Sequence, residues 1–182
     1  MRGTVTGPMV SDPSAPSPDG PDLRNPMTAA DAPSPIAPDP SFAGRTYPPG
    51  APHRVSAAKI AEFAHATGAA SPLHTDLEAA RAAGYADVVA TPTFLVSLAQ
   101  RTEAQYIEDP AAGIDFSRVV HGEEDFTLHR PVIAGDVLIP TLTVERVRAA
   151  GGHTMVTTRV DMADESGAPV AAVRSMLVVR GA

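Results

Sequence analysis

The sequence predicts an α+β fold in which one antiparallel sheet wraps around a central helix. Two observations carry this prediction. Up to about Pro110, apolar residues recur with the period of a helix, and after it they alternate with the two-residue period of strands. The four alternating runs are long and are joined by short turns, which is typical of antiparallel strands.

Residues 1–42 are predicted to form a disordered tail, and residues 43–182 a single domain. The tail holds ten of the 19 prolines, and Ser, Ala, Asp and Gly fill most of the rest. Such a composition buries too little apolar surface to offset the entropy lost on ordering. A natural start at Met9 or Met27 stays open and would shorten this tail.

Two helices are predicted ahead of the central one, each with a capping residue and a glycine stop. Ser56 caps the first, over residues 57–68, and Asp76 opens the second, over residues 76–85. The stretch AGRTYPP at residues 43–49 precedes both helices and predicts a short edge strand that ends at two prolines.

The third helix is predicted to be the buried one. It begins at Pro92, a favoured first helical position, and runs to Ile107. Its apolar face holds Phe94, Leu95, Leu98 and Ala99. The strands that follow cover residues 118–130, 136–149, 153–164 and 169–180. The turn signals at residues 130–136 predict a hairpin between the first two strands.

Composition excludes several classes of function. The absence of Cys rules out disulfides, thiolate catalysis and cysteine-based metal sites. A formal net charge of −7 disfavours a nucleic-acid partner. No apolar run is long enough for a transmembrane helix, and the N-terminus lacks the basic start and apolar stretch of a secretory signal. The sequence therefore predicts a cytoplasmic protein that does not bind a membrane. No cofactor is predicted.

Residues 67–92, TGAASPLHTDLEAARAAGYADVVATP, resemble the signature of MaoC-like (R)-specific enoyl hydratases and (3R)-hydroxyacyl thioester dehydratases. Together with GRTYPP, VSAAKIAEFAHATG and HGEEDFTLHRPVIAGD, they resemble more closely the FAS1-like dehydratase domain of the non-catalytic subunits of heterodimeric (3R)-hydroxyacyl-ACP dehydratases. The resemblance extends from Phe42 to the C-terminus. It implies a hot-dog fold, in which an antiparallel sheet wraps around a helix.

The reaction of that family needs three kinds of group. Removing water from a 3-hydroxyacyl thioester requires a base for the C2 proton, an acid for the leaving hydroxyl and donors for the thioester oxygen. In the catalytic members an Asp and a His of the loop share the proton transfers. The backbone N–H of a Gly at the start of the central helix binds the thioester carbonyl.

When this sequence is aligned with that pattern without gaps, it retains the expected residue at one catalytic position and lacks it at two. His74 matches the catalytic His, whereas Ala69 stands in place of the Asp and Ser71 in place of the Asn. Pro92 stands in place of the Gly and has no N–H to donate. Losing one such donor costs on the order of 10²–10³ in rate. The thioester region that the resemblance implies comprises Thr91, Pro92, Thr93 and Phe94.

We interpret His74 as a relic of the active site or as a polar contact at the substrate groove. Two further interpretations stay open. It could bond only to a backbone group near the helix start, or another carboxylate could replace the missing Asp. The candidate carboxylates are Asp76, Glu123 and Glu124, and Asp76 also suits a helix cap.

The strand HGEEDFTLHR has two faces. Strict alternation places His121, Glu123 and Asp125 on one face, and Glu124, Phe126 and Leu128 on the other. No third ligand is suitably spaced from His121 and His129, so no metal site is predicted.

Three hypotheses for function follow. The first is a substrate-holding, largely non-catalytic subunit of a (3R)-hydroxyacyl-thioester dehydratase in fatty-acid or related lipid or polyketide metabolism. It would bind acyl-ACP or acyl-CoA, and a hot-dog sister subunit would supply the Asp and His. The second is a self-sufficient hydratase, dehydratase or thioesterase that uses His74. The third is a homodimeric acyl-thioester binding module without catalysis. The acyl chain length, the carrier and the choice between homodimer and heterodimer stay open.

Overall fold

A computed structural model of the chain describes residues 37–181, and the other residues, 1–36 and Ala182, lie outside the described part. Most of the predicted tail, residues 1–42, therefore falls outside it. The described part begins with a short 3₁₀ helix, η1 (Pro40–Phe42), which Asp39 caps by accepting from the backbone N–H of Ser41. The Phe42 side chain is buried in the core.

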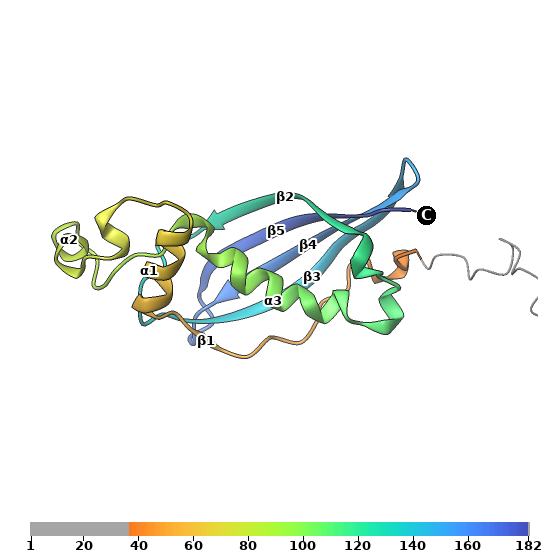
Figure 1. The fold of residues 1–182 in the computed structure, drawn as a ribbon. Coiled ribbons are helices and arrows are strands. Elements are labelled where there is room, and N and C mark those ends of the chain that lie inside the picture. The colour runs from red at the N-terminus through yellow and green to blue at the C-terminus, as the bar shows by residue number, and fades with distance from the viewer. Residues whose placement is uncertain (1–36, 182) are drawn as a thin grey trace, which may run out of the picture. The chain divides into compact units, whose positions relative to one another are not determined.

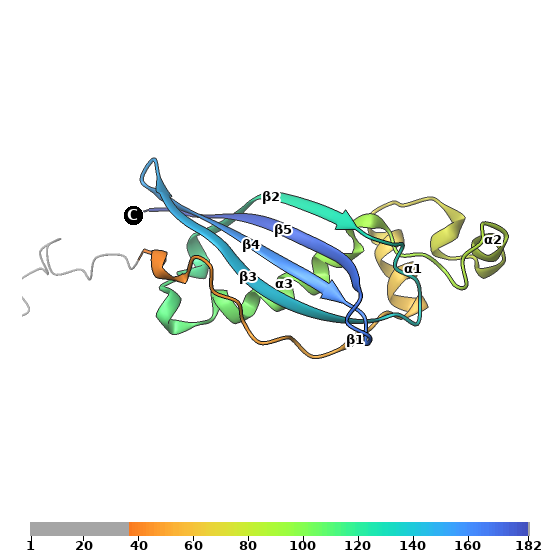
Figure 2. The same ribbon diagram turned by 180° about the vertical axis from the view of Figure 1, so that it is seen from behind.

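The described strands form one five-stranded antiparallel sheet. Its strands are β1 (His53–Arg54), β2 (Val119–Leu128), β3 (Val137–Ala150), β4 (His153–Ala163) and β5 (Pro169–Val179). They lie in the order β1-β3-β4-β5-β2, so β1 and β2 are the two edge strands. The sheet curls around α3 (Val96–Ile107), as Figures 1 and 2 show from opposite sides. The predicted α+β fold, a sheet wrapped around a central helix, is confirmed.

The segment between β2 and β3 is not the predicted hairpin. β2 pairs with β5, and β3 pairs with β1 and β4, so residues 129–136 cross from the edge strand β2 past β5 and β4 to β3. The Arg130 guanidinium donates two hydrogen bonds, of 2.7 and 3.1 Å, to the Asp136 carboxylate. The Ile133 backbone N–H donates to the same carboxylate. Turn residues predict that the chain reverses here, but they do not say which strand lies next to it.

The stretch AGRTYPP runs along β3 but forms no regular strand. Thr46 pairs with Thr143 in one antiparallel bridge, and the backbone N–H groups of Gly44 and Tyr47 donate to carbonyls of β3. The two prolines have no N–H to donate, and the edge strand β1 follows after them.

The helices agree with their predicted starts. Ser56 caps α1 (Ala57–Ala66) and Asp76 caps α2 (Leu77–Ala82), and both helices lie at one end of the sheet (Figure 1). The third helix opens as a 3₁₀ turn, η3 (Pro92–Leu95), and continues as α3. None of the described helices is long and apolar enough to cross a bilayer.

The core lies between α3 and the concave face of the sheet. As predicted, the third helix is the buried one. Its buried residues include Phe94, Leu95, Leu98 and Ala99. Alternate residues of β4 and β5, among them Val160 and Val173, meet this face of the helix with side chains that are fully buried.

Candidate functional site

The loop that carries His74 has a regular local structure. Gly68, with φ of 69°, ends α1 in a left-handed conformation that glycine adopts without strain. Ser71 then caps a second 3₁₀ turn, η2 (Pro72–His74), by accepting from the backbone N–H of Leu73 at 3.4 Å. The loop therefore presents His74 at the end of a short turn, directly before α2.

The His74 ring is held by the backbone. Its Nδ1 lies 2.6 Å from the carbonyl oxygen of Val89, and the side chain is half-buried. Because a carbonyl can only accept, Nδ1 carries the hydrogen of this bond. Among the hydrogen bonds of residues 37–181, none joins a carboxylate to His74. This arrangement is that of a histidine bonded only to a backbone group.

The residues at the two substituted positions, Ala69 and Pro92, supply neither a carboxylate nor a free N–H at the start of the third helix. Ala69 is half-buried, and its own N–H donates to the Ala64 carbonyl at the end of α1. Pro92 is exposed at the first position of η3, where an N–H would otherwise point out of the helix start. The local backbone thus forms a regular turn, with a methyl group at position 69 and a proline ring at position 92.

The remaining residues of the predicted thioester region differ in exposure. Thr93 is exposed, whereas Phe94 is only 2% exposed and packs edge-on against Phe63 with ring centroids 5.6 Å apart. Thr91 is also buried, and its hydroxyl oxygen has no hydrogen-bond partner in this structure. Of these residues, Pro92 and Thr93 present the most surface to a ligand.

The three carboxylates that were considered as partners of His74 do not bond to it. Asp76 accepts from the backbone N–H groups of Glu78 and Ala79, at 2.8 and 3.2 Å, and so caps α2 as the sequence suggests. Glu123 is exposed on β2, and Glu124 pairs with His121 at 2.8 Å between Nε2 and Oε2.

The predicted faces of β2 are wrong at His121. A bulge between His121 and Glu123 shifts the register of β2 against β5. An extra residue in a bulge breaks the alternation of side chains, and this bulge brings His121 to the side of Glu124. His129 is exposed at the far end of the strand, and no group of metal-ligating side chains large enough to hold an ion occurs within residues 37–181.

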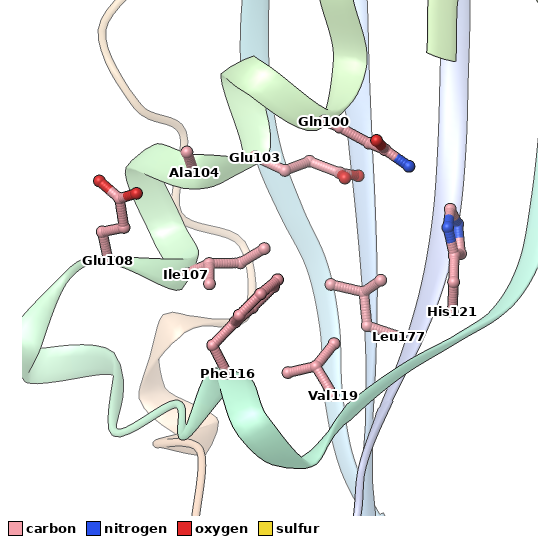
Figure 3. Close-up of a pocket in the computed structure, with 9 residues that line it drawn as sticks. All are labelled: Gln100, Glu103, Ala104, Ile107, Glu108, Phe116, Val119, His121 and Leu177. Atoms are coloured by element: carbon pink, nitrogen blue, oxygen red, sulfur yellow. The ribbon is translucent and has the colours of Figure 1, made fainter. Parts of the chain in front are cut away.

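A pocket of about 490 Å³ lies between the second half of α3 and the strands β2 and β5. Figure 3 shows an apolar part, formed by Ile107, Phe116, Val119 and Leu177. At its other end, the side chains of Gln100, Glu103 and His121 point toward one another. None of the lining residues comes from the loop that carries His74.

A polar row crosses the sheet beneath this pocket. Glu124 lies opposite Ser175, and Ser175 lies opposite Thr158, on three neighbouring strands. From α3, Glu103 accepts a 2.6 Å hydrogen bond from the Thr158 hydroxyl, although its side chain is almost fully buried. Burial raises the pKa of the Glu124 carboxyl; His121 opposes this rise and the nearby Glu103 adds to it.

Sequence analysis missed Glu103, Thr158 and Ser175. A signal for Glu103 was present, because it follows Ala99 by four residues and therefore lies on the buried face of the helix. Thr158 and Ser175 lie at inward positions of alternating strands, where a polar residue among valines marks a buried polar contact.

Comparisons with known proteins agree with the fold and the motifs. A family model described as "FAS1-like, dehydratase domain region" matches residues 41–173. A "UPF0336 protein" of Clavibacter michiganensis subsp. michiganensis is 54% identical over 143 residues, which cover 79% of this chain and 96% of that protein.

Two solved structures are similar in fold and sequence. A "MaoC-like dehydratase" superposes with a TM-score of 0.72 at 28% identity over 78% of this chain, which spans 43% of that protein's length. The truncated HadBC (3R-hydroxyacyl-ACP dehydratase) complex from Mycobacterium tuberculosis gives a TM-score of 0.67 at 27% identity, covering 75% of this chain and 96% of that one. The chain belongs to the FAS1-like dehydratase domain family, and its curled sheet around a central helix is the hot-dog fold of the MaoC-like dehydratases.

Proposed function

We propose that this chain is a substrate-holding, non-catalytic subunit of a (3R)-hydroxyacyl-thioester dehydratase. A sister hot-dog subunit would supply the catalytic Asp and His. The observation that carries the proposal is the state of the loop: within residues 37–181 no carboxylate hydrogen-bonds to His74, and Ala69 and Pro92 occupy the acid and donor positions.

The pocket supports a role in holding an acyl chain. Its apolar part would exclude water from a hydrocarbon chain, a contribution of about 0.8 kcal/mol for each buried methylene. The pocket lies beside the edge strand β2, and Phe116 at its rim is 69% exposed. An acyl chain could thus enter from a neighbouring subunit that docks along this edge.

The similarity to the HadBC structure supports a two-subunit enzyme. That structure is a complex and is described as a (3R)-hydroxyacyl-ACP dehydratase. By analogy, acyl-ACP or acyl-CoA would be the ligand of the assembly, in fatty-acid or related lipid metabolism.

The division of labour follows from the chemistry. The sister subunit would remove the C2 proton, protonate the leaving hydroxyl and bind the thioester oxygen. This chain would hold the acyl tail between α3 and β2 and keep water away from it. Positioning of that kind raises the rate because the reacting groups meet in the required geometry.

The test is turnover of a 3-hydroxyacyl or enoyl thioester. We expect no enzyme-like rate with this chain alone, and clear turnover when it is co-expressed with a hot-dog chain that carries an intact Asp and His. In that complex, His74→Ala in this chain should leave kcat unchanged within about twofold, because His74 bonds only to a backbone carbonyl.

Two outcomes would contradict the proposal. Turnover by this chain alone that His74→Ala abolishes would support a self-sufficient enzyme. Tight binding of an acyl thioester by a stable homodimer, with no gain on adding the sister chain, would support a binding module without catalysis.

A further inference from the structure

The pocket between α3 and β2 has two chemically different ends. Its apolar part begins at the rim, where Phe116 is 69% exposed. A chain that enters there passes apolar side chains first and ends among the side chains of Gln100, Glu103 and His121 (Figure 3). A plain hydrocarbon chain suits only the first of these two parts.

Glu103 sets the chemistry of the polar end. The residue is 2% exposed, and one carboxylate oxygen, Oε1, accepts the hydrogen bond from Thr158. The other oxygen, Oε2, has no hydrogen-bond donor within residues 37–181. It is not fully enclosed, unlike the unpartnered Oε1 of Glu124. A buried carboxylate that lines the pocket thus offers it a free acceptor.

Two neighbouring side chains add hydrogen-bonding groups of other kinds. The Gln100 amide both donates and accepts, and its side chain points toward Glu103 (Figure 3). His121 bonds to Glu124 through Nε2, so its Nδ1 is not used in that pair. A ligand group that donates to Glu103 and also accepts from Gln100 would satisfy both side chains.

These requirements select among the groups that an acyl chain can carry at its far end. A methyl group would displace water from Glu103 and give no hydrogen bond in return. A keto oxygen can only accept, as the carboxylate does. An ammonium group can only donate, so it leaves the Gln100 donor unsatisfied, and it is strongly hydrated. A hydroxyl group both donates and accepts, and it fits both side chains.

We propose that this pocket holds an acyl chain whose far end carries a hydroxyl group. The hydroxyl donates to Oε2 of Glu103 and accepts from the Gln100 amide, while the methylene chain lies against the apolar part. The inference rests on the proposed function and deepens it, because it names the class of acyl thioester that the assembly takes. The 3-hydroxyl of the substrate stays with the sister subunit, so this hydroxyl is a second one, remote from the thioester.

The first experiment measures the binding of straight-chain acyl-CoA thioesters to the full-length chain by calorimetry. At each length the probes differ only at the far end, which is a methyl group, an ω-hydroxyl, or a keto group on the last carbon but one. We expect the hydroxylated probe to bind at least about tenfold more tightly than the others, because only the hydroxyl donates to Glu103. Chains too short to reach Glu103 should show no difference.

Two substitutions test the named contacts. Glu103→Gln keeps an oxygen for the Thr158 hydroxyl but turns an amide donor to the pocket, so the preference for hydroxyl over keto should fall below about twofold. A merely structural role of Glu103 would weaken all probes alike. Gln100→Leu, at an exposed position, should lower the preference for hydroxyl over methyl by about threefold or more. Glu165→Gln, in the exposed turn between β4 and β5, is the control and should leave both ratios unchanged.

Two results would overturn the inference. Equal binding of all the probes at every length would mean that water, and not the ligand, satisfies Glu103. Tighter binding of an ω-amino probe than of the hydroxylated one would mean that the polar end takes a cation instead of a hydroxyl group.

The two proposals fail in different ways. In the active complex with the sister chain, the preference for the hydroxylated thioester should appear in kcat/KM. If the complex is active but has equal kcat/KM for hydroxylated and plain chains, the inference fails and the proposed function stands. If no sister chain activates the parent, the proposed function fails, whereas the binding ratios of the chain alone still test the chemistry of the pocket.

Discussion

A single hydrogen bond decides how His74 is interpreted. The loop sequence matches an active-site histidine, but the Nδ1 hydrogen is donated to Val89, and Ala69 cannot orient the ring. This bond ties the ring to the backbone, so the side chain contributes to the stability of the loop.

We expect His74→Ala to lower the free energy of unfolding by about 1 kcal/mol, because one backbone-directed hydrogen bond is lost. Urea unfolding of the isolated chain measures this change. His65→Ala, at an exposed position in the last turn of α1, serves as the control and should cost less. An unchanged stability would mean that the bond to Val89 does not hold in solution.

The buried Glu124 predicts a pH dependence of stability. Its pKa is raised above the ordinary value of 4.5, chiefly by burial, so the folded chain holds this proton more tightly than the unfolded chain. The resulting stabilisation is complete below 4.5 and is lost as the pH rises through the folded value.

Glu124→Gln should therefore be more stable than the parent at about pH 8 and differ from it less at about pH 4. Unfolding in urea at the two pH values measures this difference. A larger gain at the lower pH would contradict the raised pKa.

At the scale of elements, the Asp76 carboxylate serves as a helix cap. It accepts hydrogen bonds from two backbone N–H groups of α2 and is the side-chain cap of the helix start. We expect Asp76→Ala to cost about 1 kcal/mol of stability, and Asp76→Asn to cost much less because asparagine also caps. Both variants should keep the turnover of the complex, and a loss of kcat in the stable Asn variant would reassign Asp76 to the chemistry.

One buried hydrogen bond, between Thr158 and Glu103, links β4 to α3. Replacing Thr158 with Val removes the hydroxyl that donates to Glu103 and leaves that carboxylate buried without this donor. We expect a loss of about 1–3 kcal/mol in the free energy of unfolding. Thr158→Ser keeps the hydroxyl and should cost less, and equal losses for the two variants would show that the methyl group matters more than the hydrogen bond.

At the scale of the whole molecule, the order of strands places the pocket beside an open edge of the sheet. Because β2 lies outside β5, the second half of α3 meets an edge rather than the middle of the sheet. The loop that carries His74 lies at the other end of the helix, next to α1 and α2 (Figure 1). The pocket and the loop that carries His74 are thus separate features.

This arrangement predicts an effect on chain length. Ala104→Phe narrows the pocket, so in the complex kcat/KM for long acyl thioesters should fall about tenfold or more while that for short ones changes little. Ala58→Phe, at an exposed position of α1, is the control. An equal loss for all chain lengths would place the acyl tail elsewhere or indicate a damaged fold.

Local patterns predicted much of this fold. The helix caps Ser56 and Asp76, the buried face of the third helix and the four long strands all follow from rules that act over a few residues. The glycine stop of the first helix, ahead of the loop that carries His74, was likewise visible in the sequence.

The sequence by itself determined most of the elements and the family, because the signals for both depend on neighbouring residues. Only the tertiary structure decided which strands are neighbours, so the link at residues 129–136 crosses the sheet instead of forming a hairpin. It also decided that a bulge turns His121 toward Glu124, and that Glu103 meets Thr158. These contacts join residues distant along the chain or depend on one inserted residue, and periodicity alone predicts neither kind of contact.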